Sequence, residues 1–103
     1  MPWAKKICGI YVIRTPRGSR YVGSSHHILS RWAGHRRNLG SGKHHSPRLQ
    51  AAYNKYGGAL IFEIIEECSR DKLTEREQFW MNALGAKLNS NPNARNFWQC
   101  PEY

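Results

Sequence analysis

The hydrophobic and polar positions at the start of the chain follow the pattern of a β-hairpin. Residues 7–14 are rich in β-branched and aromatic side chains, a composition that favours a strand. Residues 15–19 have the Pro and Gly typical of a turn. Residues 20–23 predict a second short strand, which should pair with the first.

The expected turn position sets the pairing of the two strands. A turn centred near Pro16 places Tyr11 opposite Tyr21, and Gly9 opposite Gly23. Both tyrosines then lie on one face of the hairpin, because side chains alternate along a strand.

After the hairpin, residues 27–39 follow a helical period and predict a helix. Ser24 or Ser25 is its expected N-cap. At 100° per residue, one side of this helix is largely apolar and the adjacent side is basic. The first side holds Ile28, Leu29, Trp32, Arg36 and Leu39, and the basic side holds His27, Arg31 and His35.

The middle of the chain predicts a second helix and a third strand. Ser46 is an N-cap candidate followed by Pro47 at the first helical position, and the glycines after Tyr56 end the helix. Residues 59–66 are a largely apolar run of strand length, which predicts a strand in the centre of the sheet.

A third helix is expected from Asp71, as its N-cap, to about Leu84. Its apolar stripe consists of Leu73, Trp80, Met81 and Leu84. The region after it is rich in Asn and Pro and predicts irregular structure, with Phe97 and Trp98 as candidate anchors onto the core. The 103 residues therefore indicate one domain over 1–89 followed by a tail over 90–103.

Charge is distributed unevenly. The net charge is +9, and the first 62 residues carry 11 Lys or Arg, all five His and no acidic residue. The last 41 residues carry all seven acids against five Lys or Arg. Such separation favours a surface for a polyanion, most simply nucleic acid, although high net charge also serves solubility.

Other composition features exclude several classes of protein. Three cysteines without a C-x-x-C pair disfavour a disulfide scaffold and a four-cysteine zinc site. No apolar run approaches the roughly 20 residues of a membrane span, and the first residues lack a signal-peptide core. We expect no membrane partner, and the cysteine content agrees with a reducing cytoplasm.

Glu77 breaks the pattern of the last helix. It falls within the inward stripe, between Leu73 and Trp80, whereas Glu75 points to the opposite side. An inward carboxylate needs a partner. An Arg partner and a metal-ligand role are both open, because Mg²⁺ often takes one carboxylate together with water and substrate phosphate.

Arg31 and His35 are four residues apart and therefore adjacent on their helix. Arg binds phosphate oxygens in a bidentate manner, and His transfers protons near neutral pH. The alternative is a solvated basic face.

Two further groups have alternative interpretations. Tyr11 and Tyr21 are either half-buried packing residues or phenols that position or deprotonate water. The pairs His26-His27 and His44-His45 have no Cys or second His at zinc-finger spacing, so we do not expect zinc.

The sequence resembles the GIY-YIG nuclease family. The triplets Gly9-Ile10-Tyr11 and Tyr21-Val22-Gly23 match its signature, with Val in place of the second Ile. Further matches in family order and spacing are 21–25, Ser30-Arg31-Trp32 with His35, 42–45, Leu49-Gln50, 54–57, 62–68 and 75–80. The resemblance spans about Cys8 to Asn89 and is strongest to the catalytic domains of phage and intron homing endonucleases.

This resemblance implies the fold class and the reaction. The fold would be a small α/β (α+β) domain with a three-stranded antiparallel sheet flanked by about three helices. The reaction would be hydrolysis of DNA phosphodiester bonds with one divalent metal ion, Mg²⁺ or Mn²⁺. Because a two-metal site needs clustered acids, a single ion also agrees with the scarcity of carboxylates.

The resemblance also implies roles for individual residues. Tyr11 would be the general base or would orient the attacking water, and Tyr21 would support it and contact the phosphate. Arg31 would stabilise the charge on the scissile phosphate, and Glu77 would hold the metal. His35 would assist proton transfer. The set is completed by His44, as an accessory phosphate or proton group, and by Asn89 after the last helix.

The leading hypothesis is therefore a metal-dependent endodeoxyribonuclease that cleaves one strand at a time. The alternative is a non-catalytic nucleic-acid-binding module that retains the fold. Glu77 discriminates between them, because a carboxylate aimed at phosphate weakens a simple binder. Relatives of this branch carry a separate DNA-binding domain, so we expect an appended domain, a partner or a transient dimer on DNA.

Overall fold

The three strands form one antiparallel sheet in the order β2-β1-β3. In this computed structural model, which describes residues 6–89, β1 spans Gly9–Arg14, β2 spans Arg20–Ser25 and β3 spans Ile61–Glu67. The α+β class and the three-stranded antiparallel sheet implied by the resemblance are confirmed.

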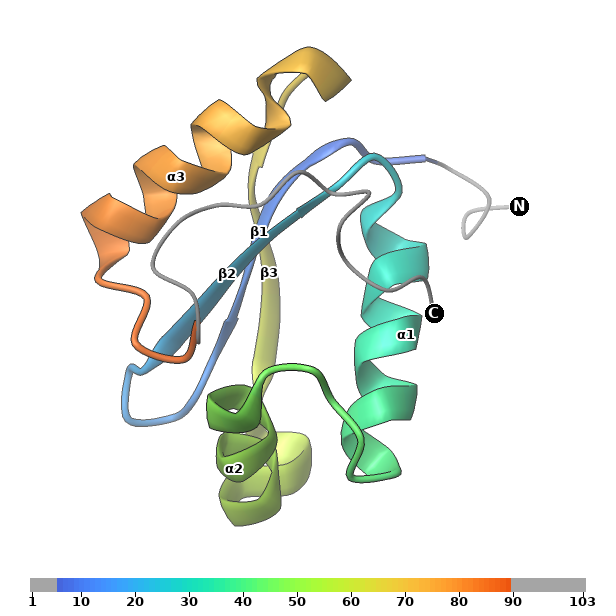
Figure 1. The fold of residues 1–103 in the computed structure, drawn as a ribbon, viewed down its shortest axis with the longest axis vertical. Helices are drawn as coiled ribbons and strands as arrows, with labels where there is room; N and C mark the ends of the chain where they lie inside the picture. Colours follow the sequence, from blue (N-terminus) through green and yellow to red (C-terminus); the bar gives the residue numbers. More distant parts are fainter. Residues whose placement is uncertain (1–5, 90–103) are drawn as a thin grey trace.

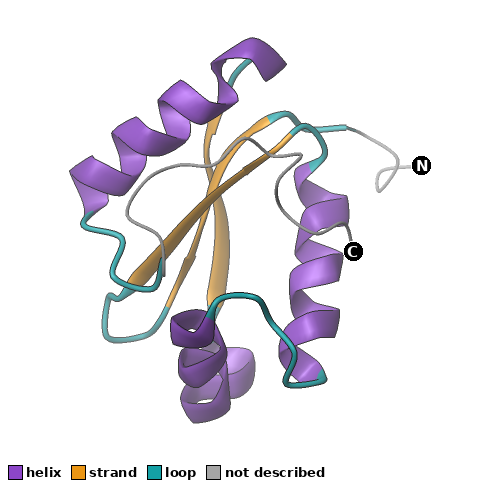
Figure 2. Ribbon diagram, viewed as in Figure 1, coloured by secondary structure: helices purple, strands orange, loops and turns teal. Residues whose placement is uncertain are grey.

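Helices cover both faces of this sheet (Figures 1 and 2). Helix α1 spans Ile28–Gly40, α2 spans Pro47–Tyr56 and α3 spans Leu73–Leu84. Short 3₁₀ turns at Gly57–Ala59 and Arg70–Lys72 follow α2 and precede α3. Helices α1 and α2 lie on one face, called here the α1/α2 face, and α3 lies on the other, the α3 face.

The alternation of side chains along β1 and β2 divides the core between these faces. The α1/α2 face holds Tyr11, Ile13, Tyr21, Ile28, Leu39, Leu49, Ala52 and Leu60. The α3 face holds Ile10, Val12, Val22, Leu73 and Met81, with Trp80 and Leu84 packed against them. The apolar stripe predicted for the last helix is therefore the stripe that packs.

The predicted hairpin register is wrong by two residues. Tyr11 faces Gly23, Gly9 faces Ser25, and Tyr21 faces Ile13. Gly18 is the reason: its φ of +93° closes a turn in which the Thr15 N–H donates to the Ser19 carbonyl, so the turn centres beyond Pro16. An even shift keeps both tyrosines on one face.

Gly23 is required by this register. A Cβ at position 23 would overlap the end of the Tyr11 ring. The glycine of the second triplet therefore makes room for the tyrosine of the first.

The predicted central position of the third strand is also wrong, because β1 is central and β3 lies at an edge. Ile61 and Ile64 are more than one third exposed. An apolar run alone does not distinguish a strand buried on both faces from an edge strand. On β3, Glu66 accepts hydrogen bonds from Arg76 at 2.9 Å and from the Trp80 indole N–H at 2.8 Å, which fastens the edge to α3.

Helix caps follow the sequence at only one of three sites. The Ser46 hydroxyl accepts a hydrogen bond from the Leu49 N–H, as predicted for α2. Neither Ser24 nor Ser25 caps α1, because the Ser25 hydroxyl accepts from the N–H of His27, the residue before the helix. Asp71 does not cap α3 either, because it lies in the preceding 3₁₀ turn.

Three other expectations concern the C-terminal tail, the cysteines and membrane-spanning helices. The tail over 90–103, with Phe97 and Trp98, lies outside the described residues. Cys8 and Cys68 are free thiols. Within residues 6–89, no helix is long and apolar enough to cross a membrane.

Candidate active site

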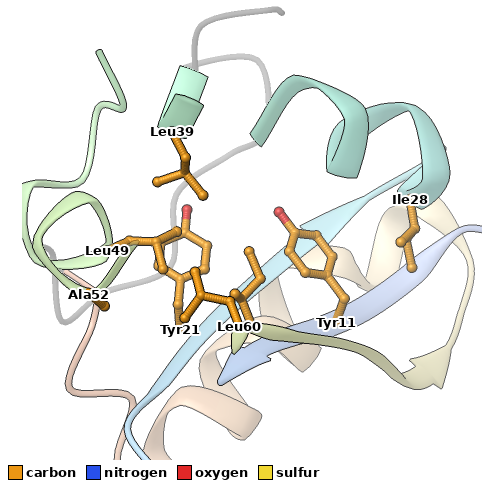
Figure 3. Close-up of a cluster of buried hydrophobic side chains, with 8 residues drawn as sticks. Tyr11, Tyr21, Ile28, Leu39, Leu49, Ala52 and Leu60 are labelled. Carbon is orange, nitrogen blue, oxygen red and sulfur yellow. The ribbon is translucent and has the colours of Figure 1, made fainter. Parts of the chain in front are cut away.

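Four side chains implied by the resemblance meet on the α1/α2 face. Tyr11 and Tyr21 rise from adjacent strands with their hydroxyl groups pointing the same way (Figure 3). His35 comes from the third turn of α1, and His44 from the loop before α2. The fold thus collects groups from four consecutive segments.

Hydrogen bonds join three of these groups into one chain, called here the Tyr–His–His chain: Tyr11, His35 and His44. The Tyr11 hydroxyl lies 2.5 Å from His35 Nε2. His35 Nδ1 lies 2.6 Å from His44 Nε2. On the far side, the Ser46 backbone N–H donates to His44 Nδ1 at 3.0 Å.

All three members of this chain are buried. Tyr11 is 1% exposed, His35 0% and His44 8%. Burial, reinforced by the neighbouring charges of His44, Arg31 and His45, lowers the pKa of His35 well below its ordinary value. Burial and the charge of His45 lower the pKa of His44 to about 4. Both imidazoles are therefore neutral at physiological pH.

Tyr21 lies beside this chain. Its ring makes edge contacts with His35 and His44 at centroid distances of 5.5 and 6.1 Å. Its hydroxyl lies 3.4 Å from Nε2 of His45, a long hydrogen bond, and His45 stacks on His44 at 4.5 Å. Both tyrosine rings are therefore buried packing residues of the core. Their role toward water stays a prediction.

Glu77 lies on the α3 face, because it receives a hydrogen bond from Ser24, an even-numbered residue of β2. The Ser24 hydroxyl donates to Glu77 Oε1 at 2.6 Å. Burial raises the pKa of Glu77 to about 7, although the Ser24 hydrogen bond and the charge of Arg31 lower it. Glu77 is half-buried, whereas Glu75 is exposed, as the helical period predicts.

Arg31 connects the two faces electrostatically. Its charge is among the causes that lower the pKa of His35, and it also lowers the pKa of Glu77. Arg31 as a whole residue is half-buried. The charge of Arg31 therefore favours ionised Glu77, but the cost of burial outweighs this attraction.

Asn89 lies against the outer edge of β2. Its side-chain oxygen accepts from the Val22 N–H at 2.8 Å, and its amide nitrogen donates to the Val22 carbonyl at 2.9 Å. Both ends of the amide thus pair with backbone, which fastens the segment after α3 to the strand that carries Tyr21. A direct role in the chemistry stays a prediction.

Three polar residues of the site were not singled out from the sequence. Ser24 holds Glu77, His45 contacts Tyr21, and Gln50 accepts the His44 backbone N–H at 3.2 Å. Local signals existed for two of them, since Ser24 directly follows the predicted strand over 20–23 and His45 adjoins His44. Gln50 belongs to the Leu49-Gln50 match, but its contact with the His44 backbone exists only once α2 packs against the loop.

A single divalent cation fits the residues of the α3 face. Within residues 6–89, no group of three or more His, Cys, Asp or Glu side chains is arranged to hold a metal. Glu77 is a half-buried carboxylate whose charge is costly without a cation. One carboxylate completed by water and phosphate oxygens is a common Mg²⁺ arrangement.

Comparison with known proteins identifies a domain family for most of the chain. Residues 7–89 match the model of the GIY-YIG catalytic domain. Intron-associated endonuclease 1 of Enterobacteria phage T4 is 38% identical over 84 residues, which are 79% of this chain and 34% of that protein. The match therefore spans about a third of the relative's length.

Solved structures give the same result. A mutant of the catalytic domain of intron endonuclease I-TevI superposes with a TM-score of 0.73 at 34% identity, covering 86% of this chain and 92% of that one. Another structure of the I-TevI catalytic domain gives a TM-score of 0.73 at 36% identity, covering 80% and 92%.

Proposed function

The chain belongs to the GIY-YIG family, in its homing-endonuclease-like branch, and on that basis we propose that it is a metal-dependent DNA endonuclease hydrolysing phosphodiester bonds. The observation that carries the proposal is Glu77. A carboxylate buried at a cost, held by a strand hydroxyl and stabilised by the charge of Arg31, has little use in a protein that only binds phosphate.

Tyr11 would activate or orient the attacking water. Its oxygen lies at the end of the Tyr–His–His chain, where His35 assists by a hydrogen bond at 2.5 Å. Tyr11 would first release its phenol hydrogen to solvent water. Its phenolate oxygen would then take a proton from the attacking water, which leaves hydroxide for the hydrolysis and restores the phenol. Tyr21, on the adjacent strand, would support Tyr11 and contact the phosphate, and His44 would hold His35.

Arg31 would stabilise the developing charge of the phosphate. A guanidinium between the two faces can contact phosphate oxygens while water is activated on one side. Its position beside His35 and Glu77 supports this role.

Glu77 would hold one Mg²⁺ or Mn²⁺ ion, with Ser24 orienting its carboxylate. When bound, such an ion polarises the phosphate and stabilises the leaving oxygen. Ser24 occupies one carboxylate oxygen and so orients the other, which is how outer hydrogen bonds tune metal ligands.

DNA is the proposed partner, contacted by the basic, acid-free first 62 residues. One active site cuts one strand at a time, so a double-strand break would need two visits or a transient dimer. Further DNA contacts would come from an appended domain or a partner. The phage origin of the relative supports a role in a phage-infected cell.

The test is incubation of supercoiled plasmid with the protein and Mg²⁺ or Mn²⁺. We expect nicked and then linear product, none of it in excess chelator. DNA binding without cleavage at any metal or salt concentration would instead support the alternative, a non-catalytic nucleic-acid-binding module.

Glu77 and Glu75 provide a matched pair on one helix. Glu77→Gln should lower cleavage by about 10²–10³-fold or more with DNA binding retained. Glu75→Gln, on the exposed side, should cleave like the unmodified protein. Equal activity in both variants would refute the metal-ligand role of Glu77.

A further inference from the structure

One backbone group determines the direction in which hydrogen bonds are donated along the Tyr–His–His chain. The Ser46 N–H points at His44 Nδ1 from 3.0 Å. A backbone amide nitrogen can only donate, so Nδ1 must be the bare, accepting nitrogen of that ring. A neutral imidazole carries one hydrogen, and His44 therefore has its hydrogen on Nε2.

The second ring follows from the first. His44 Nε2–H faces His35 Nδ1 at 2.6 Å, so His35 Nδ1 must accept and carries no hydrogen. The hydrogen of neutral His35 is then on Nε2, which faces the Tyr11 hydroxyl oxygen at 2.5 Å. The opposite direction would leave His44 without any ring hydrogen, an imidazolate.

We propose that the Ser46 backbone N–H gives the Tyr–His–His chain a single direction, with Tyr11 oxygen as its terminal acceptor, and that Gln50 is a positioning residue that maintains it. His35 then does not withdraw the phenol hydrogen. It acts as a fixed donor that stabilises negative charge on the Tyr11 oxygen, and no proton passes through the histidines.

Gln50 holds the loop that makes this possible. Its Oε1 accepts the His44 backbone N–H at 3.2 Å, while its Nε2 donates to the Leu39 carbonyl at the end of α1 at 3.0 Å. It also donates to Asn54 Oδ1 at 3.0 Å. One side chain on α2 therefore links the end of the helix that carries His35 to the loop that carries His44.

The hydrogen positions stand on geometry, whereas their use in water activation rests on the proposed function. The two failures are distinguishable. A protein with the stated tautomers and no cleavage would refute the nuclease proposal alone. Cleavage with different tautomers would refute the direction of the chain alone.

Long-range ¹H–¹⁵N correlation spectra of ¹⁵N-histidine-labelled full chain near neutral pH test the direction. Spectra of His35→Gln and His44→Gln assign the signals. We expect both rings as Nε2–H tautomers with bare Nδ1. A hydrogen on Nδ1 of either ring, a charged imidazolium, or averaging between tautomers would overturn the proposal.

Variants of Gln50 test the positioning role. Gln50→Ala should average the His44 tautomers and lower the plasmid cleavage rate by about 10–100-fold, with DNA binding retained. Gln50→Glu keeps the acceptor for the His44 N–H and should restore the tautomer and most of the rate. Asn54→Ala removes only the exposed partner of Gln50 and should change neither. An unchanged His44 spectrum in Gln50→Ala would refute the positioning role.

Discussion

The two faces of the sheet hold their polar groups in opposite ways. On the α1/α2 face, buried neutral rings satisfy one another through successive hydrogen bonds that end on a backbone amide. On the α3 face, the half-buried Glu77 carboxylate accepts a hydrogen bond from the Ser24 hydroxyl, and its pKa is raised to about 7. The polar groups of the α1/α2 face are preorganised without a ligand. The Glu77 carboxylate of the α3 face would be stabilised most by a bound cation.

This difference indicates that the α1/α2 face contributes fixed geometry and the α3 face contributes negative charge. A satisfied network is rigid and fixes where hydrogens lie. A half-buried carboxylate with a raised pKa is stabilised in its ionised form when a cation binds to it. Arg31, which acts on both faces, is where the two meet.

Removing the end of the Tyr–His–His chain should have the largest effect. Tyr11→Phe keeps the ring and deletes the oxygen, and we expect cleavage to fall by about 10²–10⁴-fold in plasmid assays. Tyr53→Phe on α2 is the matched control. A normal cleavage rate in Tyr11→Phe would mean that Tyr11 serves only in packing and takes no part in the reaction.

Ser24→Ala tests the α3 face. Loss of the donor to Glu77 should weaken Mn²⁺ binding, measured by titration calorimetry without DNA, by about 10–100-fold. Ser24→Thr should restore it, and Ser30→Ala on exposed α1 surface is the control. Unaltered affinity in Ser24→Ala would mean that Glu77 needs no support.

Acid should destabilise the α1/α2 face through its histidines. His44 accepts a proton near pH 6.5 when unfolded but only near about 4 when folded, so protonation favours the unfolded chain. Stability is lost as pH falls through this window, by about 3 kcal/mol from His44. Urea unfolding at several pH values should show a smaller loss for His44→Gln, and an equal loss would contradict the burial argument.

Asn89→Ala should have the smallest effect of the four. It leaves the Val22 N–H and carbonyl without their side-chain partner, and we expect about 1–3 kcal/mol lower unfolding free energy. Asn89→Asp retains the acceptor and should lose less. A cleavage loss at a temperature where the variant is fully folded would place Asn89 in the chemistry, as the resemblance implies.

The sequence predicted the elements better than their arrangement. Periodicity located the three helices and the inward side of Glu77, because both depend on local geometry. It misplaced β3, because the neighbours of a strand are set by long-range pairing. The hairpin register predicted from a turn at Pro16 was also wrong, because Gly18 determines the turn.

The candidate site shows the same limit. Arg31, His35 and Glu77 stood out through spacing and charge, and the resemblance added the tyrosines and His44. The direction of the Tyr–His–His chain was not accessible, because it depends on a backbone N–H and on Gln50. Such contacts exist only once the loop packs between α1 and α2.

The contact between Gly23 and Tyr11 has a consequence for how such a chain tolerates insertion. The two triplets contact each other because Tyr11 and Gly23 are paired on adjacent strands. The number of residues between the triplets does not determine this contact. Residues added at the 15–19 turn lengthen a surface loop at small entropic cost. The hairpin can therefore grow at its tip without moving the tyrosine, as long as the glycine stays opposite it.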